Sequence, residues 1–143
     1  MIFFRLAKSS KCHPPGMQRY VNPTEAPPPQ GGYSQAIEVS GASRLLFISG
    51  QIPVRPDGTV PSGFAAQCEQ VWANLGACLR KAGLGFGDLV KVTTYLSDRR
   101  YAAENSRIRR EVLGDHRPAL TILIAGIYDE GWLLEIEAIA AAR

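Results

Sequence analysis

Two carboxylates near the C-terminus are the side chains best placed to do chemistry in this 143-residue sequence. Glu135 and Glu137 stand in the run LLEIEAIA, where apolar and acidic residues alternate. Because successive side chains of a β-strand point to opposite faces, this pattern predicts a strand that carries both carboxylates on one face. Such carboxylates either face solvent or line a site, where a carboxylate can deprotonate a water molecule as a general base.

An apolar run precedes this strand and is expected to pair with it. Residues 119–125 carry no charge, which is typical of a strand that is covered on both faces. The turn residues GIYDEG follow at 126–131, so we predict a C-terminal β-hairpin. Within its first strand, Leu120 and Ile122 share one face because they are two residues apart.

The cysteines give little support to metal or disulfide chemistry. Cys68 and Cys78 fall in one predicted helix, about 15 Å apart at a rise of about 1.5 Å per residue, which is too far for a disulfide. Three cysteines without metal-ligand spacing indicate free thiols in a reducing compartment, and hence a cytoplasmic protein. No further ligands cluster with Cys12 and His13, so we expect neither a metal nor a cofactor.

Charge and hydropathy exclude two classes of partner. The formal net charge is +3, and no basic run is longer than a pair such as Arg109–Arg110, which argues against nucleic-acid binding. No apolar run approaches the roughly 18 residues of a transmembrane helix, so we expect no membrane partner.

The N-terminus differs in composition from the rest of the chain. Its first 20 residues contain four basic and no acidic side chains. We interpret residues 1–19 as an extension that is disordered or follows from a start assigned too early, with Met17 as the natural beginning. An organelle presequence is the other interpretation. The domain is expected to span residues 20–143.

The remaining elements follow from periodicity. Strands are predicted at 34–41, 44–49 and 89–96, and short extended pieces should flank a turn at Asp57–Gly58. A helix is predicted at 64–82, capped by Ser62 and ended by Gly83. Ser97–Asp98 should cap a second helix that ends at Gly114. Its inward stripe is Tyr101, Asn105, Ile108 and Val112, and its solvent face is Arg107, Arg109, Arg110 and Glu111.

This order of elements predicts an α+β domain. Two helices cannot cover both faces of such a sheet, so they should lie on one face. The apolar content of the strands then suggests that the other face is buried against another subunit in a symmetric oligomer. The residues behind this expectation are Val92, Tyr95, Leu120, Ile122 and Leu133.

Several segments, in this order, resemble the Rid family of YjgF-like proteins, whose founding members are reactive-intermediate deaminases. They are GGYSQAIEV, LLFISGQIP, the first helix with Gln67 and Asn74, DLVKVTTYLSD, Asn105, RPALT and EIEAIA. The resemblance covers about Tyr20 to Arg143. It implies a chorismate-mutase-like fold with a single-layer mixed sheet, a homotrimer, and small-molecule clefts between neighbouring subunits.

The resemblance also implies a reaction and its residues. The family hydrolyses imine tautomers of 2-aminoacrylate-type compounds to a 2-oxo acid and ammonia. Glu135 matches the glutamate that activates water, and Tyr33, Ser49, Gly50 and Asn105 match residues that border the cleft. The pocket floor corresponds to Leu120 and Ile122.

Position 120 departs from the family pattern. The family motif Pro-Ala-Arg supplies a guanidinium for the substrate carboxylate, but here the motif is Pro118-Ala119-Leu120. Hydrogen bonds to charged groups contribute about 1.5–3 kcal/mol, and an unpartnered carboxylate against leucine adds a desolvation cost. We therefore expect weak or no 2-iminopropanoate deaminase activity. Arg117 is a poor substitute, because three residues along a strand place it on the opposite face.

Two functions remain in contention. The first is an imine or enamine hydrolase whose substrate is not 2-aminoacrylate and needs no critical carboxylate. The alternative is a trimer that binds small molecules in the same clefts without catalysis. Ribonuclease activity, a property of some relatives, is disfavoured by the low charge and by the lack of a basic stripe interleaved with aromatic residues.

Overall fold

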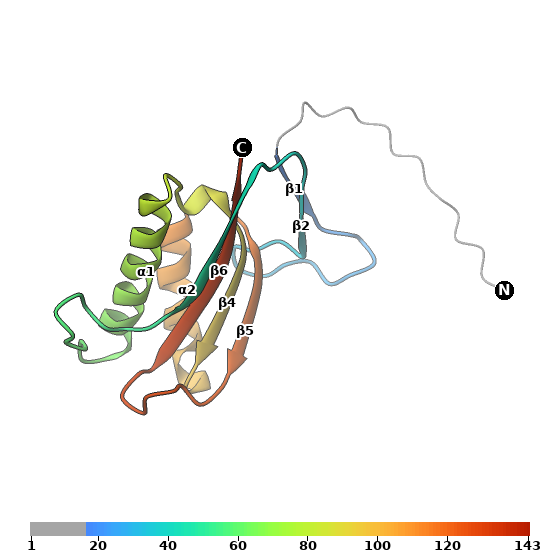
Figure 1. The fold of residues 1–143 in the computed structure, drawn as a ribbon. Helices are drawn as coiled ribbons and strands as arrows, with labels where there is room; N and C mark the ends of the chain where they lie inside the picture. Colours follow the sequence, from blue (N-terminus) through green and yellow to red (C-terminus); the bar gives the residue numbers. More distant parts are fainter. Residues whose placement is uncertain (1–16) are drawn as a thin grey trace, which may run out of the picture.

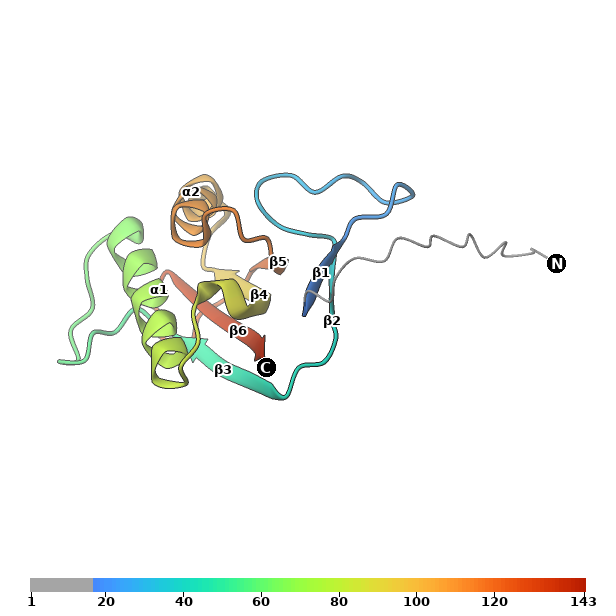
Figure 2. The ribbon, with the colours of Figure 1, turned by 90° about the horizontal axis from the view of Figure 1, so that it is seen from above.

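A four-stranded mixed sheet with both helices on one face forms the body of the protein (Figures 1 and 2). The computed structural model describes residues 17–143, so the expected N-terminal extension lies almost wholly outside the described residues. The strands of the sheet are β3 (Arg44–Gln51), β4 (Leu89–Leu96), β5 (Ala119–Ile124) and β6 (Leu134–Ala142). This arrangement confirms the predicted α+β class with two helices on one face.

Strand β6 occupies an interior position in this sheet. It pairs antiparallel with β3 on one side and with β4 on the other. The predicted alternation is confirmed, because one set of its side chains is at most 4% exposed and packs under the helices, namely Leu134, Ile136, Ala138 and Ala140. Each buried leucine or isoleucine contributes about 1.5–3 kcal/mol through loss of apolar surface to water.

The predicted C-terminal hairpin is wrong. The strand order is β3-β6-β4-β5, so β4 separates β5 from β6. The cause is the connection through helix α2 (Ala102–Leu113), a crossover that returns β5 parallel to β4. As an edge strand β5 is not covered on both faces within one chain, and Leu123 is 48% exposed.

Helix α1 (Phe64–Lys81) carries the predicted apolar stripe. Cys68, Val71 and Leu75 are 0% exposed and pack on the sheet. The helix begins at Gly63, which has a φ of 85° and provides no side-chain cap, so the capping role expected of Ser62 is absent. Gly83, with a φ of 72°, follows the last turn as predicted.

Helix α2 differs from its prediction in one important residue. Asn105 and Ile108 are buried as expected. Asp98 caps the short 3-10 helix η2 (Arg99–Tyr101), where it accepts a hydrogen bond from the Arg100 backbone N–H at 2.9 Å. The N-cap of α2 itself is Tyr101, which provides no side-chain cap. Arg109, however, is not on the solvent face: it is only 2% exposed. Among residues 17–143, no helix is long and apolar enough to cross a membrane.

A separate two-stranded ladder precedes the sheet. Strand β1 (Gln18–Val21) pairs antiparallel with β2 (Ala36–Val39), and an Arg19–Glu38 ion pair of 2.8 Å links them. Figure 2 shows the ladder across the sheet from α1. The turn at Asp57–Gly58 forms, with the Thr59 backbone N–H donating to Asp57 Oδ1 at 2.9 Å, but the extended pieces around it are not strands.

Candidate functional site

The Glu135 carboxylate lies against the backbone of β3 at Gly50. A Cβ atom added to Gly50 would stand 1.8 Å from Glu135 Oε1 and 2.7 Å from its Cδ, so a larger residue would force the Glu135 side chain to move. Glu135 is half-buried and faces away from the helices, opposite Tyr95 in the β4–β6 register. Within residues 17–143 its side chain forms no hydrogen bond or ion pair, so both oxygens remain available.

Glu137 lies on the same face but has a partner. Tyr95 donates its phenolic O–H to Glu137 Oε1 at 2.7 Å, and this hydrogen bond raises the pKa of Tyr95. The prediction that Glu135 and Glu137 share one face is thus confirmed. Their environments separate their roles, because one carboxylate is engaged in a hydrogen bond and the other is not.

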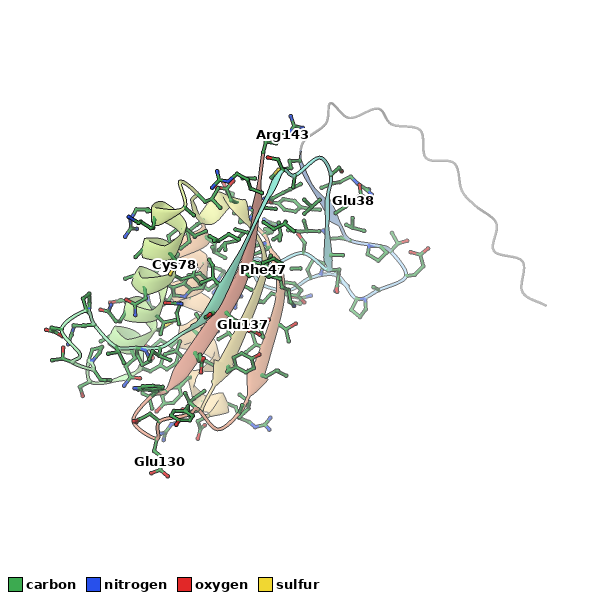
Figure 3. All side chains as sticks on the ribbon, viewed as in Figure 1. Glu38, Phe47, Cys78, Glu130, Glu137 and Arg143 are labelled. Carbon is green, nitrogen blue, oxygen red and sulfur yellow. The ribbon has the colours of Figure 1, made fainter. Side chains whose placement is uncertain are left out.

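A hollow of about 300 Å³ lies on this open face, near the middle of the sheet. Ser49 lines it, and the Ser49 carbonyl also accepts a hydrogen bond from Gln51 Nε2 at 2.9 Å. Figure 3 shows Phe47 and Glu137, which also line the hollow, over the sheet and away from the helix that carries Cys78. Lys91 spans the hollow's edge and donates to Thr121 Oγ1 at 2.6 Å.

The other predicted cleft residues lie on the opposite side of the sheet. Leu120 pairs with Val92 and Ile122 with Thr94, and both β4 partners are 0% exposed under the helices. Leu120 and Ile122 therefore pack against the core, and the expectation that Val92, Leu120 and Ile122 supply apolar surface to the open face is wrong.

Asn105 and the segment around Tyr33 belong to this helix side. Asn105 is 0% exposed, and its Oδ1 lies 4.0 Å from Cys68 Sγ. Ser34, next to Tyr33, donates its backbone N–H to the Pro118 carbonyl at 3.2 Å and so fixes the segment beside β5. In one chain, then, the predicted residues form two groups, with Glu135, Gly50 and Ser49 on one face and the rest on the other.

Arg109 is a buried charged residue on the helix side, although the sequence predicts it on the solvent face of α2. Its Nη2 donates to the Gly31 carbonyl at 2.8 Å, while Nε and Nη1 are buried without a hydrogen-bond partner. Burial, followed by the like charge of Arg110, lowers the pKa of Arg109. The available signal was its spacing, since Arg109 lies four residues after Asn105 and hence on the same helix face.

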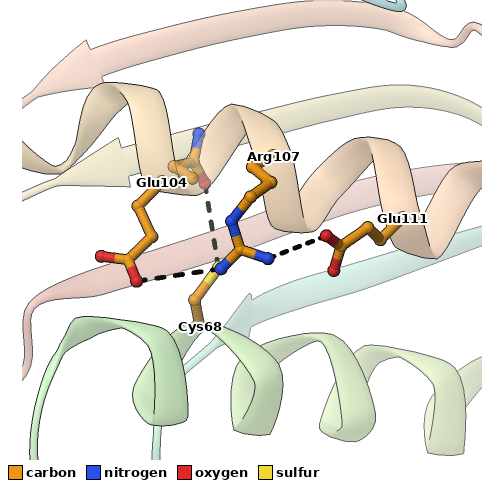
Figure 4. Close-up of polar contacts among 5 residues, drawn as sticks. Cys68, Glu104, Arg107 and Glu111 are labelled. Atoms are coloured by element: carbon orange, nitrogen blue, oxygen red, sulfur yellow. Dashed lines mark hydrogen bonds and ion pairs between the residues drawn. The ribbon is translucent and has the colours of Figure 1, made fainter.

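Polar contacts elsewhere on α2 are structural. Arg107 bridges Glu104 at 3.9 Å and Glu111 at 2.8 Å on the exposed side of the helix (Figure 4). Burial, with smaller contributions from Glu69 and Glu104, raises the pKa of Cys68 to about 12, so this thiol stays protonated at neutral pH. Residues 17–143 contain no group of three or more side chains suited to hold a metal ion.

Comparison with known proteins agrees with this architecture. The family model described as Endoribonuclease L-PSP matches residues 23–142. A RutC family protein of Pyrococcus horikoshii is 38% identical over 126 residues, which is 87% of this chain and 98% of that protein. The Rid family protein YyfB of Yersinia pestis superposes with a TM-score of 0.78 at 29% identity, covering 89% of this chain and 100% of YyfB. The chain belongs to the Rid family.

Other Rid relatives carry more specific descriptions. A mouse 2-iminobutanoate/2-iminopropanoate deaminase is 32% identical over 126 residues, covering 87% of this chain and 91% of the mouse protein. The structure of E. coli TdcF with bound serine has a TM-score of 0.66 at 29% identity, covering 87% of this chain and 99% of TdcF.

The fit of Glu135 against Gly50 can be tested by a double-mutant cycle. Gly50→Ala should destabilise the protein by about 0.5–1.5 kcal/mol, because the new methyl group overlaps the carboxylate and forces the Glu135 side chain out of its rotamer. In a Glu135→Ala background the same substitution should cost markedly less. Melting temperatures at one protein concentration measure both. Gly126→Ala is the control, since a Cβ there meets nothing within 4 Å. Equal costs in the two backgrounds would show that Glu135 does not lie against Gly50.

Proposed function

We propose that this Rid-family chain hydrolyses the carbon–nitrogen double bond of a small imine, or of the imine tautomer of an enamine, and that its substrate is other than 2-aminoacrylate. The observation that carries the proposal is the Glu135 carboxylate, which lies against Gly50 and has no protein partner among residues 17–143. A half-buried carboxylate with free oxygens is suited to orient a water molecule and to accept its proton. The relatives described as 2-iminobutanoate/2-iminopropanoate deaminases support the reaction class.

The proposed reaction has two steps. Water adds to the imine carbon while Glu135 takes one water proton. The electron pair of the C=N bond moves to nitrogen, and Glu135 passes the proton on to that nitrogen. Glu135 then takes the hydroxyl proton of the amino alcohol and delivers it to nitrogen as the C–N bond breaks, so ammonia leaves and a carbonyl compound remains. We propose that the backbone at Ser49 and Gly50, next to Glu135, holds the amino alcohol.

The working site is proposed to lie between two copies of the chain. Glu135 faces the open side of the sheet, whereas Asn105, Leu120 and Ile122 face the helix side. The two groups can line one cleft only if different copies supply them. We therefore propose a homotrimer in which the open face is covered.

Leu120 should limit the hydrolysis of 2-iminopropanoate. Leu120 offers no hydrogen bond to a carboxylate, so turnover of 2-iminopropanoate is expected to be weak or absent. The alternative function is a binding protein that keeps the clefts and has lost the chemistry, which the serine-bound structure of the relative TdcF makes worth testing. For either function we propose a cytoplasmic domain of residues 20–143 that needs no metal, cofactor, nucleic acid or membrane.

A coupled assay separates these functions. A serine dehydratase generates 2-aminoacrylate, and the release of the keto acid is followed with wild type, Leu120→Arg and Glu135→Gln. Leu120→Arg should raise turnover about tenfold or more if its guanidinium regains the carboxylate, since about 1.4 kcal/mol corresponds to a factor of ten. Imines of longer 2-oxo acids are assayed in parallel.

On any imine that wild type hydrolyses, Glu135→Gln should lower kcat by at least about a hundredfold. Full activity of that variant would refute the assigned mechanism. The absence of turnover on every imine tested, together with retained ligand binding, would favour the binding protein.

The oligomer can be tested on the open face. Phe47 is 70% exposed in the single chain, an unusual position for a large aromatic side chain. Light scattering at micromolar concentration should give three times the monomer mass of 15.6 kDa, and Phe47→Glu should shift the population toward monomer. Tyr128→Glu, at a residue 95% exposed on a loop, is the matched control and should leave the mass unchanged. A monomeric wild type would contradict the shared cleft.

A further inference from the structure

The Arg109 guanidinium is buried without a counter-ion. It is 2% exposed, and its one hydrogen bond is from Nη2 to the Gly31 carbonyl at 2.8 Å. The ion pairs formed within residues 17–143 involve other arginines, namely Arg19, Arg100 and Arg107. Two of its three nitrogens, Nε and Nη1, therefore point N–H groups at no acceptor.

Such a group is costly unless something binds it. Arginine keeps its proton in proteins, so Arg109 cannot escape the cost of burial by becoming neutral. A buried charge without a partner loses its hydration and gains nothing in exchange. A side chain of this kind indicates an anion that is present when the protein functions.

Further unpartnered polar groups lie around the guanidinium. Asn105 stands one helical turn earlier, and its Nδ2 is buried without an acceptor. Ser34 is 2% exposed, and its hydroxyl is also unpartnered. Buried donors without acceptors on Arg109, Asn105 and Ser34 suit an anion with more than one oxygen, such as a carboxylate.

The segment that lies over Arg109 contains two consecutive glycines. Gly31 and Gly32 have φ values of 85° and 80°, a conformation that other residues adopt with strain. A Cβ at Gly32 would come within 3.2 Å of the Arg110 side chain, so the segment lies directly on α2. Residues 31–34 therefore separate the guanidinium from solvent, and the Ser34 backbone N–H joins this segment to the Pro118 carbonyl at 3.2 Å.

We propose that Arg109 binds the carboxylate of the substrate in place of the guanidinium that is missing at position 120. The inference rests on the proposed function and specifies its substrate class: an imine that carries a carboxylate. It replaces the sequence-based expectation that the carboxylate is not critical. Because the cation comes from α2 and not from β5, the carboxylate is held at a different position, so weak turnover of 2-iminopropanoate and binding of acids are compatible.

Binding of 2-oxo acids tests the proposal without any turnover. Pyruvate, 2-oxobutanoate and 2-oxohexanoate are each titrated calorimetrically against their neutral amides. At least one acid should bind wild type tenfold or more tightly than its amide. Its Kd should rise at least tenfold in Arg109→Gln. The rise should be smaller in Arg109→Lys, which keeps the positive charge but cannot form the two parallel hydrogen bonds of a guanidinium. Arg107→Gln makes the same charge change on the exposed side of α2 and should bind like wild type.

Stability distinguishes ligand binding from a structural role. If Arg109 serves to bind an anion, Arg109→Met should keep or raise the melting temperature of the ligand-free protein, because an uncompensated charge is removed. It should also abolish the stabilisation that the acids give to wild type. A lower melting temperature with unchanged acid affinity would overturn the proposal, as would wild type that binds no acid better than its amide. Acid binding does not depend on Glu135, so the role of Arg109 can be judged even if Glu135→Gln shows that the assigned catalytic mechanism is wrong. The two proposals can therefore be refuted independently.

Discussion

The alternation of side chains along β6 is the constraint on which the rest of the structure depends. Leu134, Ile136 and Ala140 are 0% exposed beneath the helices, so the residues between them must face the other way. A slip of one residue would place two carboxylates in the core, and this penalty fixes the register against both β3 and β4. The fixed register carries Glu135 to Gly50, the point where the neighbouring strand has no side chain.

Local patterns could be predicted from the sequence, whereas contacts between distant segments could not. The stripe of α1 and the faces of β6 follow from periods of 3.6 and two residues, which the chain displays directly. The pairing of β5 depends on the path of α2, and no periodicity shows that β4 takes the place between β5 and β6. The family resemblance supplied candidate residues but not the faces on which one chain presents them.

Arg109 shows how residue type can outweigh spacing. It lies on the inward stripe of α2 by position, yet an arginine between other charged residues is ordinarily solvated. Its burial becomes visible only when the segment of Gly31 and Gly32 is placed over the helix. Leu120 and Arg109 are then related observations: a cation is absent from β5, and an unpartnered cation is present on the adjacent helix.

The separation of Glu135 from the helix-side residues makes a shared cleft the central claim. The most direct test mixes two variants, Glu135→Gln and Arg109→Gln, after joint unfolding and refolding, and assays an imine that wild type hydrolyses. With random assembly, about a quarter of the clefts between copies combine an intact Glu135 with an intact Arg109. Recovery of activity toward a quarter of the wild-type value is the predicted result. A mixture as inactive as its two components, in confirmed mixed oligomers, would contradict a site that two copies build together.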